Sequence, residues 1–427
     1  MSGGTATTTT SRTRDRLPLR GWLLAEAVSL TGTRVSMVAI PWFVLTTTGS
    51  ATLTGLVAFA EMAPLVALKA LAGPLVDRVG ARRVAIGADL GSFVAVGLVP
   101  ALHLAGLLSF PVLLGLVAVA GALRGPGDGA KHAMIPALVE HADVPTERAT
   151  GLSSAIERTA SMAGAALAGV LIALLGPTTA LALDAASFLL SAAILVTTTG
   201  ALRRPAVTPA QDEAGEPEPP YLHRLREGWQ FLRRDPLLLG LSLMVAVTNL
   251  FDQAYVAVLV PVWAKETGGG AAAIGTLFAV FSGAAIAGAA LASAYASRLP
   301  RYTTYLVAFL VCGSPRFLVL ALESPLWAVL AVAVVSGFGA GFINPVLGAV
   351  IFERIPTHLV GRVSALNTAL CWSLIPFGGL VGGLLVGGLG MAGAMLACGA
   401  AYLAATMLPA VQPQWREMDR RPAAGAA

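Results

Sequence analysis

The sequence predicts an all-α membrane protein whose twelve transmembrane helices form two pseudo-symmetric bundles of six. Three observations support this fold class. First, 56% of the 427 residues are apolar and only 12% are charged, with a mean hydropathy of +0.77, which is not the composition of a soluble domain. Second, the apolar residues gather in runs long enough to cross a hydrocarbon core of ~30 Å as helices. Third, the longest hydrophilic interruption, 200–236, lies at the midpoint of these runs.

The apolar windows give the expected order of elements. They are 22–44, 53–76, 84–104, 107–130, 151–175 and 179–199 in the first half, and 237–263, 272–296, 303–322, 326–352, 363–386 and 391–411 in the second. We therefore expect an N-terminal tail at 1–20, a first bundle at 21–199, a linker at 200–236, a second bundle at 237–411 and a C-terminal tail at 412–427.

Basic residues indicate the sidedness of these spans. Clusters of arginine and lysine occur in every second connection, whereas connections such as 46–52 and 176–177 are nearly neutral. By the positive-inside rule, both termini are expected on the cytoplasmic side of the inner membrane. The first twenty residues have no apolar core, so they predict a cytoplasmic tail and not a cleavable signal peptide. The net charge of +5 is spread over short loops, which argues against nucleic-acid binding.

The linker contains an amphipathic pattern. Apolar side chains recur at helical spacing over 221–234, beside four arginines. This pattern predicts a basic amphipathic helix on the inner leaflet, and the alternative is a solvated linker. In both cases the segment joins two halves, and these halves carry related patterns. Pro41-Trp42 recurs as Pro261-Val-Trp263, and Ile135-Pro136 recurs as Ile355-Pro356.

A charged, glycine-bounded turn separates the second and third apolar windows. Gly73 and Gly80 allow a sharp turn and close helix approach, and Asp77 can accept hydrogen bonds at a helix end. The basic side chains hold the turn on the inner face. The full set of candidate residues for a conformational-switch loop is Gly73, Leu75, Asp77, Arg78, Gly80, Arg82 and Arg83. The alternative is an ordinary positive-inside loop, which needs the arginines but neither the aspartate nor the glycines.

The spacing of this turn matches G-x-L-x-D-R-x-G-x-[RK]-[RK] and resembles the loop between helices 2 and 3 of the major facilitator superfamily of secondary transporters. The resemblance extends from about Leu19 to Pro409. Segments such as Ser29-Leu-Thr-Gly32 and Phe352-Glu353-Arg354-Ile-Pro356 are similar to the branch of enterobactin-type siderophore exporters and macrolide efflux proteins. The resemblance implies two six-helix bundles, alternating access and a substrate site between the bundles near the membrane midplane.

Charges inside apolar windows are costly and therefore informative. Our candidates for proton or substrate coupling are Glu26, Arg34, Arg124 and Asp252, of which Arg124 resembles the helix-4 arginine of many proton-coupled members. A carboxylate such as Asp252 can carry a proton as access alternates. The alternative for each is a buried ion pair that only fixes helix packing. Asp89, Lys69, Asp128 and Glu157 are expected to have structural roles.

Aromatic and amide side chains predict the cavity lining. The candidates are Trp42, Phe59, Asn249, Gln253, Tyr255 and Trp372, and the alternative for the aromatic residues is lipid-facing or interfacial packing. The sequence contains no nucleotide-binding motif, metal-ligand cluster or catalytic constellation, so we expect neither an enzyme nor a metal or cofactor site. The three cysteines lie in apolar runs, which makes a disulfide framework unexpected.

We therefore expect a monomeric, proton-coupled exporter of an amphiphilic small molecule such as a drug, an antibiotic or a siderophore-like compound. Its partners are the substrate, protons and the lipid bilayer. Two alternatives remain open. One is a proton-coupled uptake symporter or facilitator for a small nutrient, which predicts a more polar midplane. The other is a membrane protein that does not transport. This alternative does not explain the charged turn at 73–83.

Overall fold

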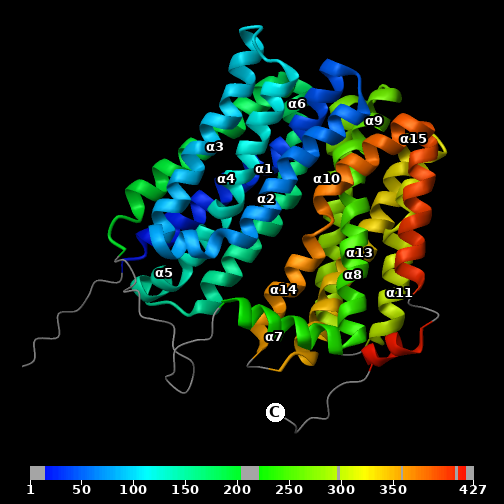
Figure 1. Ribbon diagram of the computed structural model, residues 1–427. Helices are drawn as coiled ribbons and strands as arrows, with labels where there is room; N and C mark the ends of the chain where they lie inside the picture. Colours follow the sequence, from blue (N-terminus) through cyan, green and yellow to red (C-terminus); the bar gives the residue numbers. More distant parts are fainter. Residues whose placement is uncertain (1–14, 203–220, 296–298, 357–358, 409–411, 420–427) are drawn as a thin grey trace, which may run out of the picture.

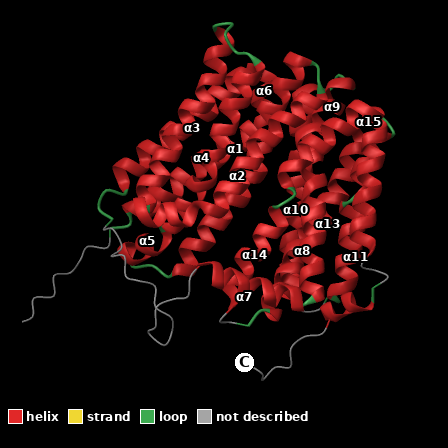
Figure 2. Cartoon of the chain, in the orientation of Figure 1, coloured by secondary structure: helices red, strands yellow, loops and turns green. Residues whose placement is uncertain are grey.

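All regular structure in the described residues is helical (Figures 1 and 2). The computed structural model describes residues 15–202, 221–295, 299–356, 359–408 and 412–419. Most of the expected N-terminal tail, the linker segment 203–220 and the end of the C-terminal tail lie outside these residues. Ten helices of the described chain are long and apolar enough to cross a membrane. The all-helical membrane class is therefore confirmed.

The first half of the chain forms six helices on one side of the molecule (Figure 1). They are α1 Leu17–Thr48, α2 Ala51–Val79, α3 Ala81–Leu104, α4 Phe110–Ala133, α5 Ile135–Ala142 and α6 Thr146–Thr198. Glycine and serine define one of the tight connections. Gly49 ends α1 with a φ of 71°, and the Ser50 side chain caps α2 by accepting a hydrogen bond from the Leu53 amide.

The second half forms the other side of the molecule, and α7 Tyr221–Arg234 precedes it at the bottom of Figure 1. Its elements are α8 Pro236–Ala254, the π-helical segment Tyr255–Leu259, α9 Val260–Glu266, α10 Gly270–Tyr295, α11 Arg301–Cys312, α12 Ser314–Ala321, α13 Leu326–Arg354, α14 Val360–Trp372 and α15 Ile375–Met407. A 3₁₀ segment, Pro413–Asp419, follows. We call α1–α6 the first helix group and α8–α15 the second.

Two long helices contain a sharp glycine kink. Gly176 in α6 has φ 82° and ψ 161°, and Gly390 in α15 has φ 71° and ψ 176°. These angles lie far from helical values and are accessible chiefly to glycine. Pro177 follows the first kink and cannot donate a backbone hydrogen bond to continue the helix. Both glycines fall in connections that the sequence predicts between two apolar windows.

The two helix groups meet at the end of the molecule that lies away from α7. There α2 packs against α15, and α6 packs against α10. A Cβ atom added to Gly275 of α10 would lie 2.7 Å from the Gly169 Cα of α6. A Cβ atom added to Gly383 would lie 2.7 Å from the Ala51 carbonyl oxygen. Glycine therefore brings the backbones of the two groups into direct contact at this end.

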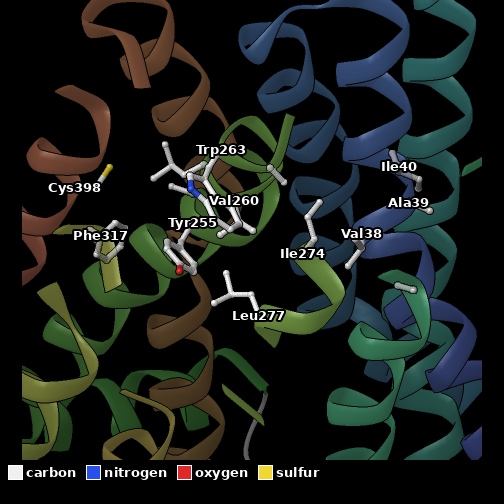
Figure 3. Packing of buried hydrophobic residues seen from close by; sticks show 14 of the residues in the cluster. Val38, Ala39, Ile40, Tyr255, Val260, Trp263, Ile274, Leu277, Phe317 and Cys398 are labelled. Atoms are coloured by element: carbon white, nitrogen blue, oxygen red, sulfur yellow. The ribbon is translucent and has the colours of Figure 1, made fainter. Parts of the chain in front are cut away.

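Buried apolar side chains continue this contact into the interior. Figure 3 shows Val38 of α1 facing Ile274 of α10, with Leu277 and Tyr255 beyond them. Ile274 is completely buried and Val38 is 4% exposed. Because the same cluster includes side chains from both helix groups, the groups share one apolar core at their closed end. Farther from that end, an internal space opens between them.

Candidate functional site

A cavity of about 310 Å³ lies between the two helix groups. Its walls come from α1 and α6 of the first group and from α8, the π-helical segment, α10, α12, α13 and α15 of the second. Most of the lining is apolar, including Met37, Val256, Phe278, Phe281 and Val332. Cavities of this size, lined by apolar surface and a few polar groups, are typical of small-molecule sites.

An ion pair between Asp252 of α8 and Arg316 of α12 lies in the cavity wall. The Arg316 guanidinium also lies over the rings of Tyr255, Phe317 and Tyr402, at 4.9, 5.0 and 5.1 Å from their centroids. These cation–π contacts and the ion pair with the carboxylate together hold the arginine in place. The Asp252 side chain remains 39% exposed, so the carboxylate is accessible to the contents of the cavity.

Local sequence explains the positions of both partners. Pro261 cannot donate a backbone hydrogen bond, and its ring opposes the Ala257 carbonyl four residues earlier. The π-helical segment Tyr255–Leu259, which begins three residues after Asp252, accommodates this disruption. On the other side, Gly313 separates α11 from α12, and Pro315 lies in the first turn of α12. This break places Arg316 in the first turn of a new helix.

Arg34 lies on the opposite wall. Gly164 of α6 gives it room, because a Cβ atom there would lie 2.5 Å from the Arg34 Cβ. The Arg34 Nη1 atom donates to the Met37 sulfur at 3.5 Å, whereas its buried Nε atom has no hydrogen-bond partner. Within the described part of the chain, no carboxylate forms an ion pair with Arg34. In this part of the chain, the cavity therefore contains a guanidinium without a counterion.

Amide side chains add a small polar patch. Asn249 and Gln253 line the cavity beside Asp252, one helical turn apart on α8. The Asn249 amide nitrogen donates to the Cys371 carbonyl oxygen at 2.9 Å and so connects α8 to α14. Ser161 and Ser282 supply hydroxyl groups from α6 and α10. Together these side chains offer several donors and acceptors within a largely apolar wall.

Two coupling candidates lie outside the cavity. Arg124 of α4 forms a buried ion pair with Glu61 of α2 at 2.5 Å. Glu26 of α1 is 2% exposed and accepts a hydrogen bond from the Ser153 hydroxyl at 3.0 Å. Its second carboxylate oxygen, Oε2, is buried and has no partner among the described residues. Arg124 is thus satisfied by a carboxylate, whereas Glu26 has a buried oxygen that a proton would neutralise.

The structure also contains a buried charge network that the sequence does not reveal. The Lys131 ammonium donates to Asp89 at 2.9 Å and to the Ser29 hydroxyl at 2.7 Å. Ser191 donates to the other oxygen of Asp89 at 2.6 Å. The sequence places Lys131 in a basic cytoplasmic stretch, yet it is 3% exposed. The available signal was Asp89 itself, because a carboxylate within an apolar window requires a cationic partner.

Only one of the four aromatic candidates for the cavity lining lies in the cavity wall. Tyr255 lines the cavity, whereas Trp42, Phe59 and Trp372 are not among its lining residues. Trp42 packs against the apolar core, and Phe59 contacts Phe377 at 5.6 Å between ring centroids. Trp372 lies under the Lys69 ammonium, 4.4 Å from the ring centroid, which joins α14 to α2. Of the six predicted lining residues, Asn249, Gln253 and Tyr255 meet in one cavity.

Most of the segment 73–83 is helical, because α2 continues to Val79 and α3 begins at Ala81, so Gly80 alone forms the connection and Gly73 lies inside α2. Gly80 has a φ of 96°, a value that strongly favours glycine. The Arg82 side chain donates to the Thr199 hydroxyl at 2.9 Å and to the Val196 carbonyl oxygen at 3.0 Å, so it ties the turn to the end of α6. Gly73 has no neighbouring atom within 4 Å of an added Cβ. Among the candidate residues of this segment, the side chains of Leu75, Asp77, Arg78 and Arg83 are exposed.

Several known proteins of similar sequence are efflux pumps. The chain is 30% identical over 423 residues to the multidrug efflux pump Tap of Mycobacterium tuberculosis, covering 97% of both proteins. It is 29% identical over 412 residues to the pump of the same name from Mycolicibacterium fortuitum, covering 95% of this chain and 98% of the pump. The alignments therefore include both helix groups and the connection between them.

Solved transporter structures share the fold. The nucleoside transporter NupG superposes with a TM-score of 0.71 at 11% identity, over 95% of this chain and all of that one. A bacterial homologue of the iron transporter ferroportin gives 0.67 at 17% identity, over 95% and 99% of the two chains. The sequence profile of the transmembrane secretion effector family matches residues 18–425. The chain therefore belongs to this family of major facilitator transporters, which are not enzymes.

Proposed function

We propose that the protein exports an amphiphilic small molecule across the inner membrane in exchange for protons, by alternating access between its two helix groups. The observation that carries this proposal is the cavity between the groups, whose apolar wall contains the Asp252–Arg316 ion pair. Apolar surface accommodates the body of an amphiphile, and a titratable pair in the same wall can link substrate movement to proton movement. The Tap relatives, which are named multidrug efflux pumps, favour export over uptake.

The proposed topology has twelve spans. Each glycine kink, at Gly176 and Gly390, divides one long helix into two spans, which gives six spans at 21–199 and six at 237–411. The positive-inside rule places α7, both tails and the linker at 200–236 on the cytoplasmic side. Since helices of both groups of one chain line the cavity, a monomer is the proposed working unit.

We infer an inward-facing arrangement from this topology. The backbone contacts at Gly169–Gly275 and Ala51–Gly383 then close the outer end. The turn at 73–83 lies on the inner side, where Asp77 is exposed. Two solved structures of similar fold, of a bacterial homologue of Spinster and of the ferroportin homologue, are described as inward-facing. In the outward-facing state, closure of the inner end is expected to give Asp77 a partner in the second helix group.

Two carboxylates are proposed to carry the proton. Asp252 is accessible from the cavity and is held by Arg316, so protonation would release the arginine. Glu26 is buried, with one oxygen lacking a partner among the described residues, so its protonated form is accommodated without breaking an ion pair. The membrane potential supplies about 2.3 kcal/mol per charge per 100 mV, which is enough for one or two protons to drive useful export.

Transport by cells that express the protein tests this proposal. Accumulation of acidic, neutral and basic fluorescent amphiphiles would be measured with and without a protonophore. The wild type should lower the accumulation of at least one dye, and both the protonophore and Asp252→Asn should abolish this effect. Glu323→Gln is the matched control, since Glu323 is exposed in the connection after α12 and does not line the cavity. Unchanged accumulation of all three dyes would contradict broad export of amphiphiles.

A further inference from the structure

The charges in the cavity wall do not cancel. The wall contains two guanidinium groups, Arg34 and Arg316, and one carboxylate, Asp252. Because Asp252 and Arg316 form an ion pair with each other, no lining carboxylate among the described residues is left to pair with Arg34. The remaining polar lining residues are neutral amides and hydroxyls. A ligand that enters this space therefore meets a site that is net positive by one charge.

The acidic neighbours of Arg34 do not form ion pairs with it. Arg124, Asp128 and Glu157 are the charged side chains near enough to interact with it electrostatically. Arg124 is paired with Glu61, and neither Asp128 nor Glu157 lines the cavity. Among the described residues, neither acid lies within ion-pair distance of Arg34. The Arg34 Nε–H is buried and unpaired there, and the Arg34 side chain lines the cavity.

An unpaired cation between transmembrane helices is expensive, and its cost falls when an anion binds it. We propose that the cavity recognises amphiphiles that carry an anionic group, such as a carboxylate, and that this group docks on Arg34. The guanidinium offers a planar fork of donors that matches a carboxylate. Phe278, Phe281 and Leu277 of α10 then hold the apolar body of the ligand. Cationic amphiphiles are disfavoured because Arg34 repels them.

This inference specifies the substrate class of the proposed exporter. Its claim about transport rests on the proposed function, whereas its claim about binding does not. Equilibrium binding tests it separately. The probes are dansyl-undecanoic acid, its methyl ester and dansyl-undecylamine, which share a fluorophore and a chain but are anionic, neutral and cationic. Their fluorescence would be titrated with the purified full-length protein in an uncharged detergent. We expect the acid to bind at least about tenfold more tightly than the ester, the effect of one charge-assisted hydrogen bond.

Variants assign the preference to one side chain. Arg34→Met should remove the preference for the acid while leaving the affinity for the ester within about twofold, and Arg34→Lys should retain most of it. Arg416→Met is the matched control, because it removes one exposed arginine of the 3₁₀ segment and leaves the cavity unchanged. Thermal unfolding of each variant checks that the fold is retained. Retention of the preference in Arg34→Met would overturn the inference.

The outcomes separate the inference from the proposed function. Equal binding of the three probes, or tighter binding of the amine, would overturn the anionic substrate class even if cells export one of them. Tight binding of the acid without export from cells would contradict the exporter proposal and leave the site assignment intact. Displacement of the acid by an equal concentration of phosphatidylglycerol would show that a lipid headgroup supplies the anion, and would overturn the assignment to a small-molecule substrate.

Discussion

Asp252 on α8 and Arg316 on α12 form an ion pair across the wall of the cavity although 64 residues separate them in the sequence. Three aromatic rings surround the guanidinium, while the carboxylate remains open to the cavity. A charge change at Asp252 therefore alters both the polarity of the cavity and the restraint on α12. Substitutions at Asp252 and Arg316 therefore test whether this ion pair couples the structure to transport.

Removal of one partner is expected to destabilise the protein more than removal of both. Arg316→Met leaves Asp252 without its partner, at a cost of about 1–2 kcal/mol, below the value for a fully buried pair because Asp252 is partly exposed. The double variant Asp252→Asn/Arg316→Met should recover most of this loss but not transport. Thermal unfolding in detergent and dye accumulation measure the two effects. Full transport by the double variant would exclude the pair from proton coupling.

Close packing at Gly275 is expected to be required for the transport cycle. A side chain there collides with Gly169, so Gly275→Leu should disfavour the observed closed end by about 1–3 kcal/mol and reduce transport by tenfold or so. Gly283→Leu on the same helix is the matched control, since nothing lies within 4 Å of a Cβ atom at Gly283. Efflux rates normalised to protein level provide the measurement. Equal activity of the two variants would contradict a role for this contact.

The two adjacent arginines of the 80–83 turn are expected to behave differently. Arg82 donates to Thr199 and Val196 at the end of α6, whereas Arg83 is exposed. Arg82→Met should therefore lower the free energy of unfolding by about 1–2 kcal/mol and slow transport. Arg83→Met removes the same charge and should have a smaller effect on both. Similar losses in both variants would indicate that loop charge alone, through the positive-inside effect, accounts for the role of the turn.

Glu26→Gln is expected to mimic the protonated carboxylate. The glutamine side chain keeps an acceptor for Ser153 and replaces the unpartnered Oε2 with an uncharged group, so the fold should be retained. If Glu26 carries the proton, concentrative export stops, while exchange of substrate down its gradient continues. Counterflow and proton-driven uptake in everted vesicles distinguish the two activities. Intact proton-driven transport by Glu26→Gln would leave Asp252 as the proposed proton carrier.

Asp235 is expected to stabilise the base of the second helix group in two ways. Its carboxylate caps α8 by accepting hydrogen bonds from the Leu237 and Leu238 amides, and it also pairs with Arg354 at the end of α13. Hydrogen bonding to Asp235 raises the pKa of Arg354, so the guanidinium stays charged. Asp235→Ala should therefore cost about 1–2 kcal/mol, and Asp235→Asn, which keeps the cap, about half as much.

Those two variants would be compared by thermal unfolding in detergent at low and high salt. Added salt should weaken the ion-pair contribution and leave the cap unchanged, so the difference between wild type and Asp235→Asn should shrink. A difference that does not depend on salt would show that the cap dominates.

The sequence singled out five residues that line the cavity, namely Arg34, Asn249, Asp252, Gln253 and Tyr255. It could do so because a polar side chain within an apolar window stands out from its neighbours. The same reasoning included Trp42, Phe59 and Trp372, which lie elsewhere. An aromatic side chain is compatible with a cavity, a helix interface or the lipid boundary, so its type alone does not select one of them.

Hydropathy determined the all-helical membrane class from the sequence alone, because the bilayer requires long apolar helices whatever surrounds them. Glycine determined the kinks at Gly176, where Pro177 follows it, and at Gly390 for a similarly local reason. Only the tertiary structure decided that Arg316 binds Asp252, that Lys131 binds Asp89, and that no described carboxylate pairs with Arg34. Charge pairing depends on which helix faces meet across the fold, and the pattern within a single helix contains no such information.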